Sequence, residues 1–353
     1  MQVEFEKREL VRTADKMVKF ARKHESNSVY SRIRITVDSG GAVFEQRGAA
    51  FYLQTKCPCR NKENGSFIVG SHMFWDIITT MGADSISLAI NSENKLIIKG
   101  ENISIDVPLY ADDFSSFSFS ENSAQQKITL DKKELASAIA KCIPFESRRD
   151  SISGVNFNLS ASEGAIKTCC MTGFCASIYT IRGVIACEDS FFTLDASIAK
   201  CIDSVLENKE IEMGIYNNFV QLTDGCSKLI IYFLNTPFPR VERAIPTTFE
   251  KKLVFDSKKM TEVLALSDAL LQEDIFYIEF DSGRLILKCG NIVSETQIAQ
   301  KDNIKIKLNK NLLKKILYAA GGDFDCFLYN PFPQPLVVKT QKQTLLIAPQ
   351  NIK

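Results

Sequence analysis

The sequence predicts an α+β protein made of three similar units, each with two helices packed on antiparallel sheets. Three observations lead to this prediction. A strand-then-helix pattern recurs at equal intervals, amphipathic helical stretches alternate with short strands, and no stretch is uniformly apolar. At 353 residues, the chain exceeds the usual size of a single hydrophobic core. Several domains are therefore expected.

The repeat is clearest where each unit begins. The matching segments are VEFEKREL (3–10), ITLDKKEL (128–135) and LVFDSKKM (253–260). Each is a strand whose last apolar residue precedes an acidic residue and then a helix. The interval from Phe5 to Leu130 is 125 residues, and the interval from Leu130 to Phe255 is the same. Equal spacing over this distance predicts three domains, with the ranges 1–122, 123–247 and 248–353.

The first helix of each unit has apolar residues at helical spacing. These residues are Leu10, Ala14, Met17, Val18 and Ala21; Leu135, Ile139, Cys142 and Ile143; and Met260, Val263 and Leu264. Asp131 and Asp256 are expected to cap the second and third of these helices. Each unit is also expected to contain a second helix that follows a strand and a capping residue, which is Ser71, Asp195 or Asn309.

The composition is that of a globular protein, with 45% hydrophobic and 24% charged residues. No apolar run reaches the roughly 18 residues of a membrane helix, and the N-terminus lacks a signal-peptide hydrophobic region. We therefore expect a cytoplasmic protein with no membrane partner. Most of the eleven cysteines lie in apolar runs and are expected to be buried, reduced thiols.

Residue patterns for catalysis or metal binding are sparse. The two histidines, His24 and His72, lie far apart, and the sequence has no phosphate-binding glycine loop and no G-x-S-x-G motif. Cys57-Pro58-Cys59 has no second ligand pair near it. The acidic pairs at 112–113 and 323–325 fall in predicted turns, where solvated carboxylates are common. We expect no enzyme activity, no metal and no cofactor.

The first helix carries a row of basic residues spaced mostly three or four positions apart, which places them on one face. They are Arg8, Arg12, Lys16, Lys19, Arg22 and Lys23. The basic residues that would extend this face to the other two repeats are Lys132, Lys133, Arg148 and Arg149, and Lys310, Lys314 and Lys315. The net charge is only +1, so binding of nucleic acid would need such a local patch. The face is either ordinary solvated surface or a track for phosphates. The predicted DNA-facing residues are Arg8, Arg12, Lys19, Arg22, Lys23 and Arg148.

Three stretches carry a family resemblance. TPFPRVERAIP (236–246) resembles the junction between the second and third domains of bacterial DNA sliding clamps, the DNA polymerase III β subunit family, with Phe238, Pro239, Arg243 and Pro246 matching. IKTCCMTGFCASIY (166–179) is similar to a strand-turn of that family, and LLIAPQNIK (345–353) is similar to its C-terminus. The chain length and the threefold repeat agree with the family from end to end.

The resemblance implies the DNA clamp fold, in which two chains close head-to-tail as a ring around duplex DNA and the helices line the hole. It implies a processivity factor that binds DNA without sequence preference. Short peptide motifs of DNA polymerase and of clamp-loader subunits would dock on it. Two alternatives stay open: a DNA-metabolism enzyme that kept this fold, and a regulator with this fold that closes no ring.

By the same resemblance, the three stretches converge on one apolar pocket for partner peptides. Its implied residues are Arg149 and Ile152 on the rim; Met171, Gly173, Phe174 and Ala176 on the floor; Pro239 and Ala244 on the connector; and Leu346, Ala348, Pro349 and Ile352 at the C-terminus. The family has a polar histidine where this chain has Phe174, which implies a more apolar pocket. The alternative is that Met171 and Phe174 fill the domain core.

The resemblance also implies a ring-closing contact between the first domain of one chain and the third domain of the other. Leu270 and Leu271 would lie at this contact, with Ile105 as the counterpart. The alternative for both leucines is the interior of the third domain.

Overall fold

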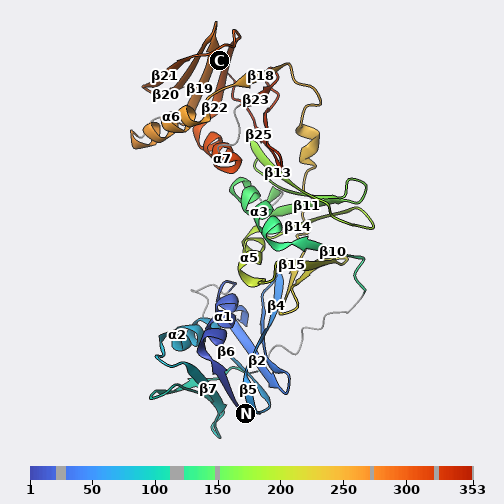
Figure 1. Cartoon of the computed structure of the whole chain (residues 1–353), viewed down its shortest axis with the longest axis vertical. Coiled ribbons are helices and arrows are strands. Elements are labelled where there is room, and N and C mark those ends of the chain that lie inside the picture. The colour runs from blue at the N-terminus through green and yellow to red at the C-terminus, as the bar shows by residue number, and fades with distance from the viewer. Residues whose placement is uncertain (21–28, 112–122, 148–151, 271–273, 322–325, 352–353) are drawn as a thin grey trace. The chain divides into compact units, whose positions relative to one another are not determined.

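The structure is a computed structural model that describes residues 1–20, 29–111, 123–147, 152–270, 274–321 and 326–351 (Figure 1). The chain forms two compact units. The first unit comprises residues 1–136 and 197–233, and the second comprises residues 137–196 and 234–353. Each unit joins one end of the chain to part of its middle third. The three-domain division with boundaries at 122 and 247 stays a prediction.

The first unit contains a five-stranded and an eight-stranded sheet, both antiparallel. In spatial order, the smaller sheet has β5 (Arg60–Glu63), β1 (Gln2–Glu6), β7 (Ser85–Ile90), β8 (Lys95–Lys99) and β9 (Ser104–Pro108). The larger has β10 (Gln126–Asp131), β15 (Glu210–Ile215), β16 (Phe219–Thr223), β17 (Ser227–Tyr232), β4 (Phe51–Cys57), β3 (Gly41–Arg47), β2 (Arg32–Asp38) and β6 (Gly65–Gly70). Because β17 pairs with β4, this sheet continues across the predicted boundary at 122.

The second unit also contains two antiparallel sheets. The eight-stranded sheet has the order β14 (Ser190–Leu194), β11 (Val155–Ser160), β12 (Ala165–Met171), β13 (Cys175–Arg182), β25 (Gln343–Ile347), β24 (Leu336–Lys339), β23 (Cys326–Tyr329) and β18 (Lys251–Val254). The four-stranded sheet has the order β21 (Ile292–Gln297), β20 (Arg284–Cys289), β19 (Ile275–Asp281) and β22 (Asn303–Asn309). Pairing of β13 with β25 carries the larger sheet across the predicted boundary at 247.

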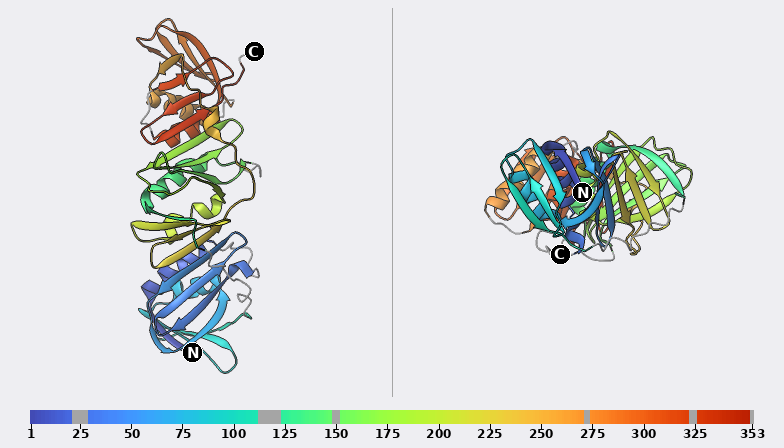
Figure 2. Two further views of the ribbon diagram at one scale, coloured as in Figure 1. Left: turned by 90° about the vertical axis from the view of Figure 1, so that its right-hand side faces the viewer. Right: turned by 90° about the horizontal axis from the view of Figure 1, so that it is seen from below.

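Helices cover one face of the eight-stranded sheet in each unit (Figures 1 and 2). The described helices are α1 (Lys7–Val18), α2 (Ser71–Thr80), α3 (Lys132–Cys142), α4 (Ala196–Ala199), α5 (Ile202–Val205), α6 (Ser257–Ala269) and α7 (Lys310–Ala320), with short 3-10 turns η1 (Val29–Ser31), η3 (Ile143–Phe145) and η5 (Val241–Ala244). The predicted apolar stripe of α1 is confirmed, since Leu10, Ala14 and Met17 are buried. The core therefore lies between helices and sheet, as the amphipathic pattern predicts.

Helix starts agree with the sequence at three positions. The side chains of Asp256 and Asn309 accept backbone N–H groups from the first turns of α6 and α7. Asp131 Oδ1 accepts the N–H group of Glu134 at 3.0 Å. Ser71 differs: it is the first residue of α2, and its hydroxyl donates to the backbone carbonyl of Ser31 at 2.8 Å. The Ser71 hydroxyl therefore links α2 to η1 instead of capping the first turn of α2.

The second helix of the middle repeat is interrupted. The predicted helix after Asp195 forms as α4 and α5, with Lys200 and Cys201 between them. At the break, the N–H group of Cys201 donates to the carbonyl of Ile198, three residues back, at 3.0 Å. This i→i−3 bond tightens the turn and ends the regular α-helical ladder.

Two lysines at equivalent places in the repeat perform the same structural role. Lys7 and Lys132, 125 residues apart, are the first residues of α1 and α3. Each reaches the end of the second helix of its own repeat and donates to free carbonyl groups there. The acceptors are the backbone oxygens of Thr79, Met81, Asp203 and Leu206. A charged donor at these carbonyls satisfies groups that the helix itself leaves unpaired.

A Lys132→Met variant is expected to lower the free energy of unfolding by about 1.5 kcal/mol, because methionine keeps the apolar stem but leaves the carbonyls of α5 without their donor. Urea unfolding followed by circular dichroism measures this change. The neighbouring Lys133→Met variant is the control, with the same change of charge on the same helix. An equal loss in the two variants would contradict the capping role of Lys132.

All eleven cysteines are free thiols, and seven of them are buried, as the apolar runs predict. Burial raises the pKa of Cys57 to about 11, so this thiol stays protonated and unreactive at neutral pH. Within the described ranges, no helix is long and apolar enough to span a bilayer. The described residues also contain no group of three or more His, Cys, Asp or Glu side chains arranged to hold a metal ion.

Candidate peptide-docking and nucleic-acid interfaces

The proline-rich connector at 235–250 is anchored on the eight-stranded sheet of the second unit. Its Phe238 and Val241 are buried in an apolar cluster that we call the docking cluster. The cluster consists of Cys169, Ala176, Ile178, Phe238, Val241, Val337 and Leu346, with Met171, Ile245, Phe249 and Leu328 packed against it. The three stretches that carry the family resemblance therefore meet here.

Polar contacts fix the connector at the same place. Glu242 Oε1 accepts a hydrogen bond from Asn158 Nδ2 of β11 at 3.0 Å. The guanidinium of Arg240 lies 5.6 Å from the centroid of the Phe191 ring of β14. These contacts explain why charged residues alternate with apolar anchors in this segment.

The turn between β12 and β13 holds Phe174 outward. Thr172 Oγ1 accepts the N–H groups of Phe174 and Cys175 at 3.2 and 3.1 Å. The N–H group of Ala348 donates to the carbonyl of Phe174 at 2.8 Å. Phe174 is nevertheless 64% exposed. Its ring therefore does not fill the domain core, so the core alternative is wrong for Phe174. Its place in a peptide pocket stays a prediction.

The C-terminal stretch lies beside this turn. Leu346 of β25 is the register partner of Ala176 of β13. Beyond the strand, the N–H group of Gln350 donates to the carbonyl of Lys307 of β22 at 2.8 Å. The tail is thus tied both to the β12–β13 turn and to the four-stranded sheet.

The structure brings together some of the described residues predicted for the pocket. Met171, Ala176 and Leu346 belong to the docking cluster or pack on it, and Ala348 contacts the turn at Phe174. Four of the predicted residues are exposed: Gly173 and Phe174 on the turn, and Pro239 and Ala244 on the connector. Pro349 is half-buried. Ile152 precedes β11 and does not belong to the docking cluster. Arg149 and Ile352 lie outside the described residues. Thr172 was missed, although a threonine before glycine is typical of a side-chain-stabilised turn.

The basic face of α1 is only partly as predicted. Arg8, Arg12 and Lys19 are exposed, whereas Lys16 is buried and 5% exposed. Lys16 Nζ lies 2.7 Å from Glu207 Oε1 and donates to Ser227 Oγ at 3.1 Å. Placing Lys16 on the phosphate track was therefore wrong. The other predicted DNA-facing residues, Arg22, Lys23 and Arg148, lie outside the described residues.

Three of the lysines that extend the basic face to the other repeats, Lys132, Lys310 and Lys314, have structural partners. Lys132 caps α5, and Lys310 and Lys314 of α7 form ion pairs with Asp268 of α6. Hydrogen bonds from Lys314 and Lys310 lower the pKa of Asp268. These cations join neighbouring helices, so they are not free for phosphate contacts.

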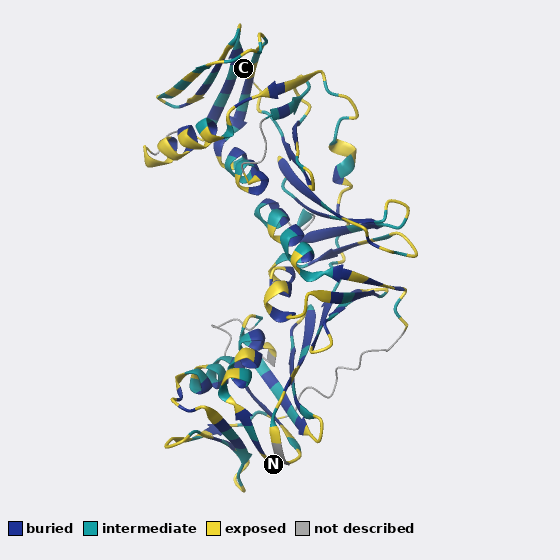
Figure 3. Ribbon diagram, in the orientation of Figure 1, coloured by how far each residue is buried: buried dark blue, intermediate teal, exposed yellow. Residues whose placement is uncertain are grey.

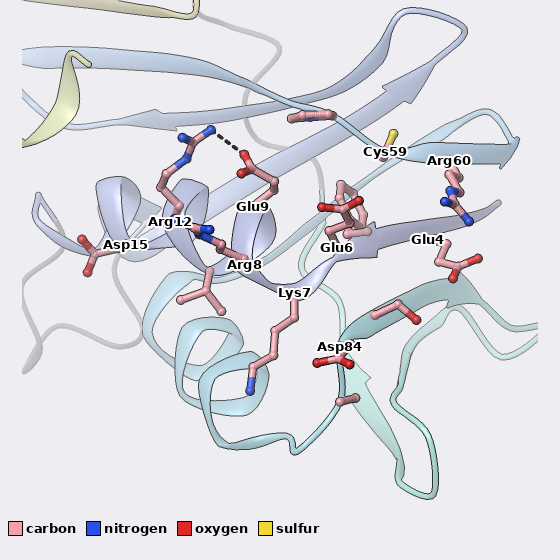
Figure 4. Close-up of a pocket in the computed structure, with 15 residues that line it drawn as sticks. Glu4, Glu6, Lys7, Arg8, Glu9, Arg12, Asp15, Cys59, Arg60 and Asp84 are labelled. Carbon is pink, nitrogen blue, oxygen red and sulfur yellow. Dashed lines mark hydrogen bonds and ion pairs between the residues drawn. The ribbon is translucent and has the colours of Figure 1, made fainter. Parts of the chain in front are cut away.

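An open hollow of about 1350 Å³ lies beside the start of α1 in the first unit (Figure 4). Its walls come from β1, α1 and the connections before β5 and β7. The charged residues that line it are Glu4, Glu6, Glu9, Asp15 and Asp84, together with Lys7, Arg8, Arg12 and Arg60. The two signs nearly balance, so the hollow lacks the single-sign field that concentrates an ionic ligand.

Several positions along α6 are exposed (yellow in Figure 3), and large apolar residues are among the exposed ones on and beside α6 and on β21. Leu266 and Leu270 lie one helical turn apart and are 48% and 59% exposed, and Val293 of β21 is 53% exposed. The interior alternative is therefore wrong for Leu270, and Leu271 lies outside the described residues. Ile105 is half-buried on β9, and both β9 and β21 are edge strands of their sheets.

These features define the class of fold: repeated strand-helix units, helices on one face of shared sheets, and a connector packed on the second shared sheet. It is the fold of bacterial sliding clamps. DNA polymerase III subunit beta from Pseudomonas aeruginosa superimposes with a TM-score of 0.90 at 14% identity, covering 100% of both chains. The beta subunit from Thermotoga maritima gives 0.86 at 14% identity, again covering 100% of both.

A third similar structure was solved with a ligand. The Helicobacter pylori beta clamp bound to a DNA ligase peptide has a TM-score of 0.86 and 14% identity, with 99% of this chain and 100% of the other covered. No protein-family model and no curated protein matches the sequence. The resemblance inferred from the sequence is thus confirmed at the level of the fold, over the whole chain.

Proposed function

We propose that this protein is a sliding clamp, a processivity factor that encircles duplex DNA and tethers DNA polymerase to it. The observation that carries the proposal is the fold match over the full length of the chain, with TM-scores of 0.86 to 0.90. The mechanism is topological and needs no catalytic group. A closed ring cannot leave the duplex sideways, so weak, sequence-independent contacts suffice, and weak contacts permit sliding.

The proposed partners are peptides of DNA polymerase and of clamp-loader subunits. Support comes from the docking cluster, where an exposed aromatic ring and a tethered tail surround buried apolar residues. Small-ligand and peptide sites commonly combine such apolar walls with a few polar groups. The Helicobacter pylori clamp, solved with a DNA ligase peptide, supports the same kind of partner here. The proposed place of action is the cytoplasm.

The ring is proposed to form from two chains through a head-to-tail contact. The edge strand β9 would meet the edge strand β21 of the partner, with Ile105, Leu266 and Leu270 beside the contact. Edge strands leave a row of backbone donors and acceptors unpaired, and exposed apolar side chains next to them favour association. Such a contact is heterologous and forms a closed ring only if the rotation fits.

A second candidate is a regulator with this fold that closes no ring on DNA. The observation that favours it is the charge of α1, where most described cations already pair with carboxylates. A surface of this kind has little attraction for phosphates.

Retention on circular DNA tests the proposal. Protein loaded onto a nicked circular plasmid by its clamp loader is expected to remain bound in about 0.5 M salt, where charge contacts to phosphates are largely lost. Cutting the plasmid once should then release it. The measurement is gel filtration of labelled protein with DNA before and after cutting. If the protein washes off the closed circle as readily as off a short linear duplex, encirclement is wrong.

A further inference from the structure

Most cations of α1 are held by carboxylates. The Arg12 guanidinium is hydrogen-bonded to Glu9, one turn back on the same helix (Figure 4). It also lies 3.4 Å from Glu207 Oε2. Lys19 Nζ lies 3.0 Å from Asp15 Oδ2. Arg12 is therefore exposed, but two carboxylates, those of Glu9 and Glu207, already contact its guanidinium.

Arg8 differs from its neighbours. It is exposed, and among the residues that the structure describes, no carboxylate forms an ion pair with it. It lies one turn before Arg12, so both side chains emerge near one another on the helix. A phosphate that approaches this face meets one free arginine and one arginine that is shared with acids.

Glu207 has a fixed position from which to hold Arg12. Its backbone N–H group donates to Asp224 Oδ2 at 2.6 Å, and its carboxylate also pairs with the buried Lys16 at 2.7 Å. This carboxylate cannot rotate away from Arg12 without leaving Lys16 buried and unpaired, which is costly. Glu9 is half-buried, with 24% of its side chain exposed, but its partner Arg12 is 53% exposed, so removal of Glu9 leaves no buried cation unpaired.

We propose that Glu9 is a positioning residue that keeps the Arg12 guanidinium from binding DNA phosphates. As a result, α1 binds the duplex weakly, and among its described residues Arg8 makes the main contact with phosphate. This inference rests on the proposed function, which places α1 against the duplex. An acid that competes with phosphate for an arginine lowers affinity without changing the path of the DNA, which suits a ring that must slide.

The test is a Glu9→Gln variant binding a short linear duplex, measured by fluorescence anisotropy across a salt series. Without Glu9, Arg12 keeps only the longer 3.4 Å contact with Glu207, which leaves part of its guanidinium open to a phosphate. Affinity is therefore expected to rise by up to about eightfold in 0.1 M salt, and the salt slope to steepen by at most about 0.9. Glu93→Gln is the matched control, since Glu93 is exposed, pairs with Lys95 and lies on a hairpin of the same unit. It has the same change in net charge, and its affinity is expected to stay unchanged.

A double-mutant cycle separates a specific effect from general repulsion. If Glu9 acts through Arg12, its removal has no effect in an Arg12→Gln background. An equal gain in both backgrounds, or an equal gain for Glu93→Gln, would overturn the proposal. Glu9→Ala, which removes the same carboxylate and favours the helix, serves if Glu9→Gln fails to fold. A failure of the proposed clamp function gives a different result from a failure of this inference. In that case, the wild-type protein itself would not stay on closed circular DNA in high salt.

Discussion

A Leu270→Lys variant is expected to be a folded monomer under conditions where the wild type is a dimer. Leu270 is 59% exposed at the end of α6, so lysine is accommodated without disturbing the core. At the proposed contact, it would place a charge where an apolar side chain is buried, at a cost of about 2 kcal/mol. A two-chain ring contains this contact twice. The combined loss of about 4 kcal/mol weakens the dimer roughly a thousandfold.

Light scattering coupled to size exclusion measures the mass in solution. The control is Ile185→Lys, because Ile185 is 90% exposed on the loop between β13 and β14, away from α6 and β21. This variant should stay dimeric. A Leu270→Lys protein that remains a dimer would contradict the assignment of α6 to the ring contact. A wild type that is already monomeric would favour the regulator that closes no ring.

A Phe174→Ala variant is expected to lose at least about thirtyfold in affinity for a polymerase-tail peptide while it keeps its fold and its dimeric state. An exposed aromatic ring on a backbone fixed by hydrogen bonds has the properties of an interface hot spot, and truncation of a hot spot costs about 2 kcal/mol or more. The ring is preorganised, so little entropy is lost when a peptide covers it. Isothermal titration calorimetry measures the loss.

Phe332→Ala is the matched control, since Phe332 is exposed to a similar extent, 54%, on the loop between β23 and β24. Its peptide affinity should equal that of the wild type. Deletion of residues 350–353 removes the contact of the tail with Lys307 and is expected to weaken the same peptide. Unchanged binding in both the Phe174 variant and the truncated protein would show that partners dock elsewhere.

The segments that begin each repeat and the helix caps could be predicted because each is recognised from a pattern of a few neighbouring residues. The interval of 125 residues places Lys7 and Lys132 at equivalent positions, and both prove to cap the second helix of their repeat. The caps at Asp256 and Asn309 follow from side chains that bond within one turn. Information of this kind is contained in a short window of sequence.

The burial of Lys16 could not be predicted in this way. Helical periodicity assigns Lys16 to the same face as Arg12, but its environment is set by Glu207 and Ser227, which come from the middle of the chain. The orientation of Phe174 likewise depends on a hydrogen bond from Ala348. Contacts between residues far apart in the sequence, such as Lys16 and Ser227, decide both cases, and no local pattern records them.

The pairing of β17 with β4 bears on how the chain can be shortened. A fragment that ends near residue 122 would keep β4 but lose β17, so the backbone groups of residues 51–55 that face β17 would become an open sheet edge. Such an edge pairs readily with other chains. The fragment 1–122 should therefore aggregate when expressed alone, whereas a fragment that also supplies residues 197–233 would keep β4 paired with β17. Strand β17 of the middle repeat thus prevents the β4 edge of the first repeat from pairing with other chains, in addition to extending its sheet.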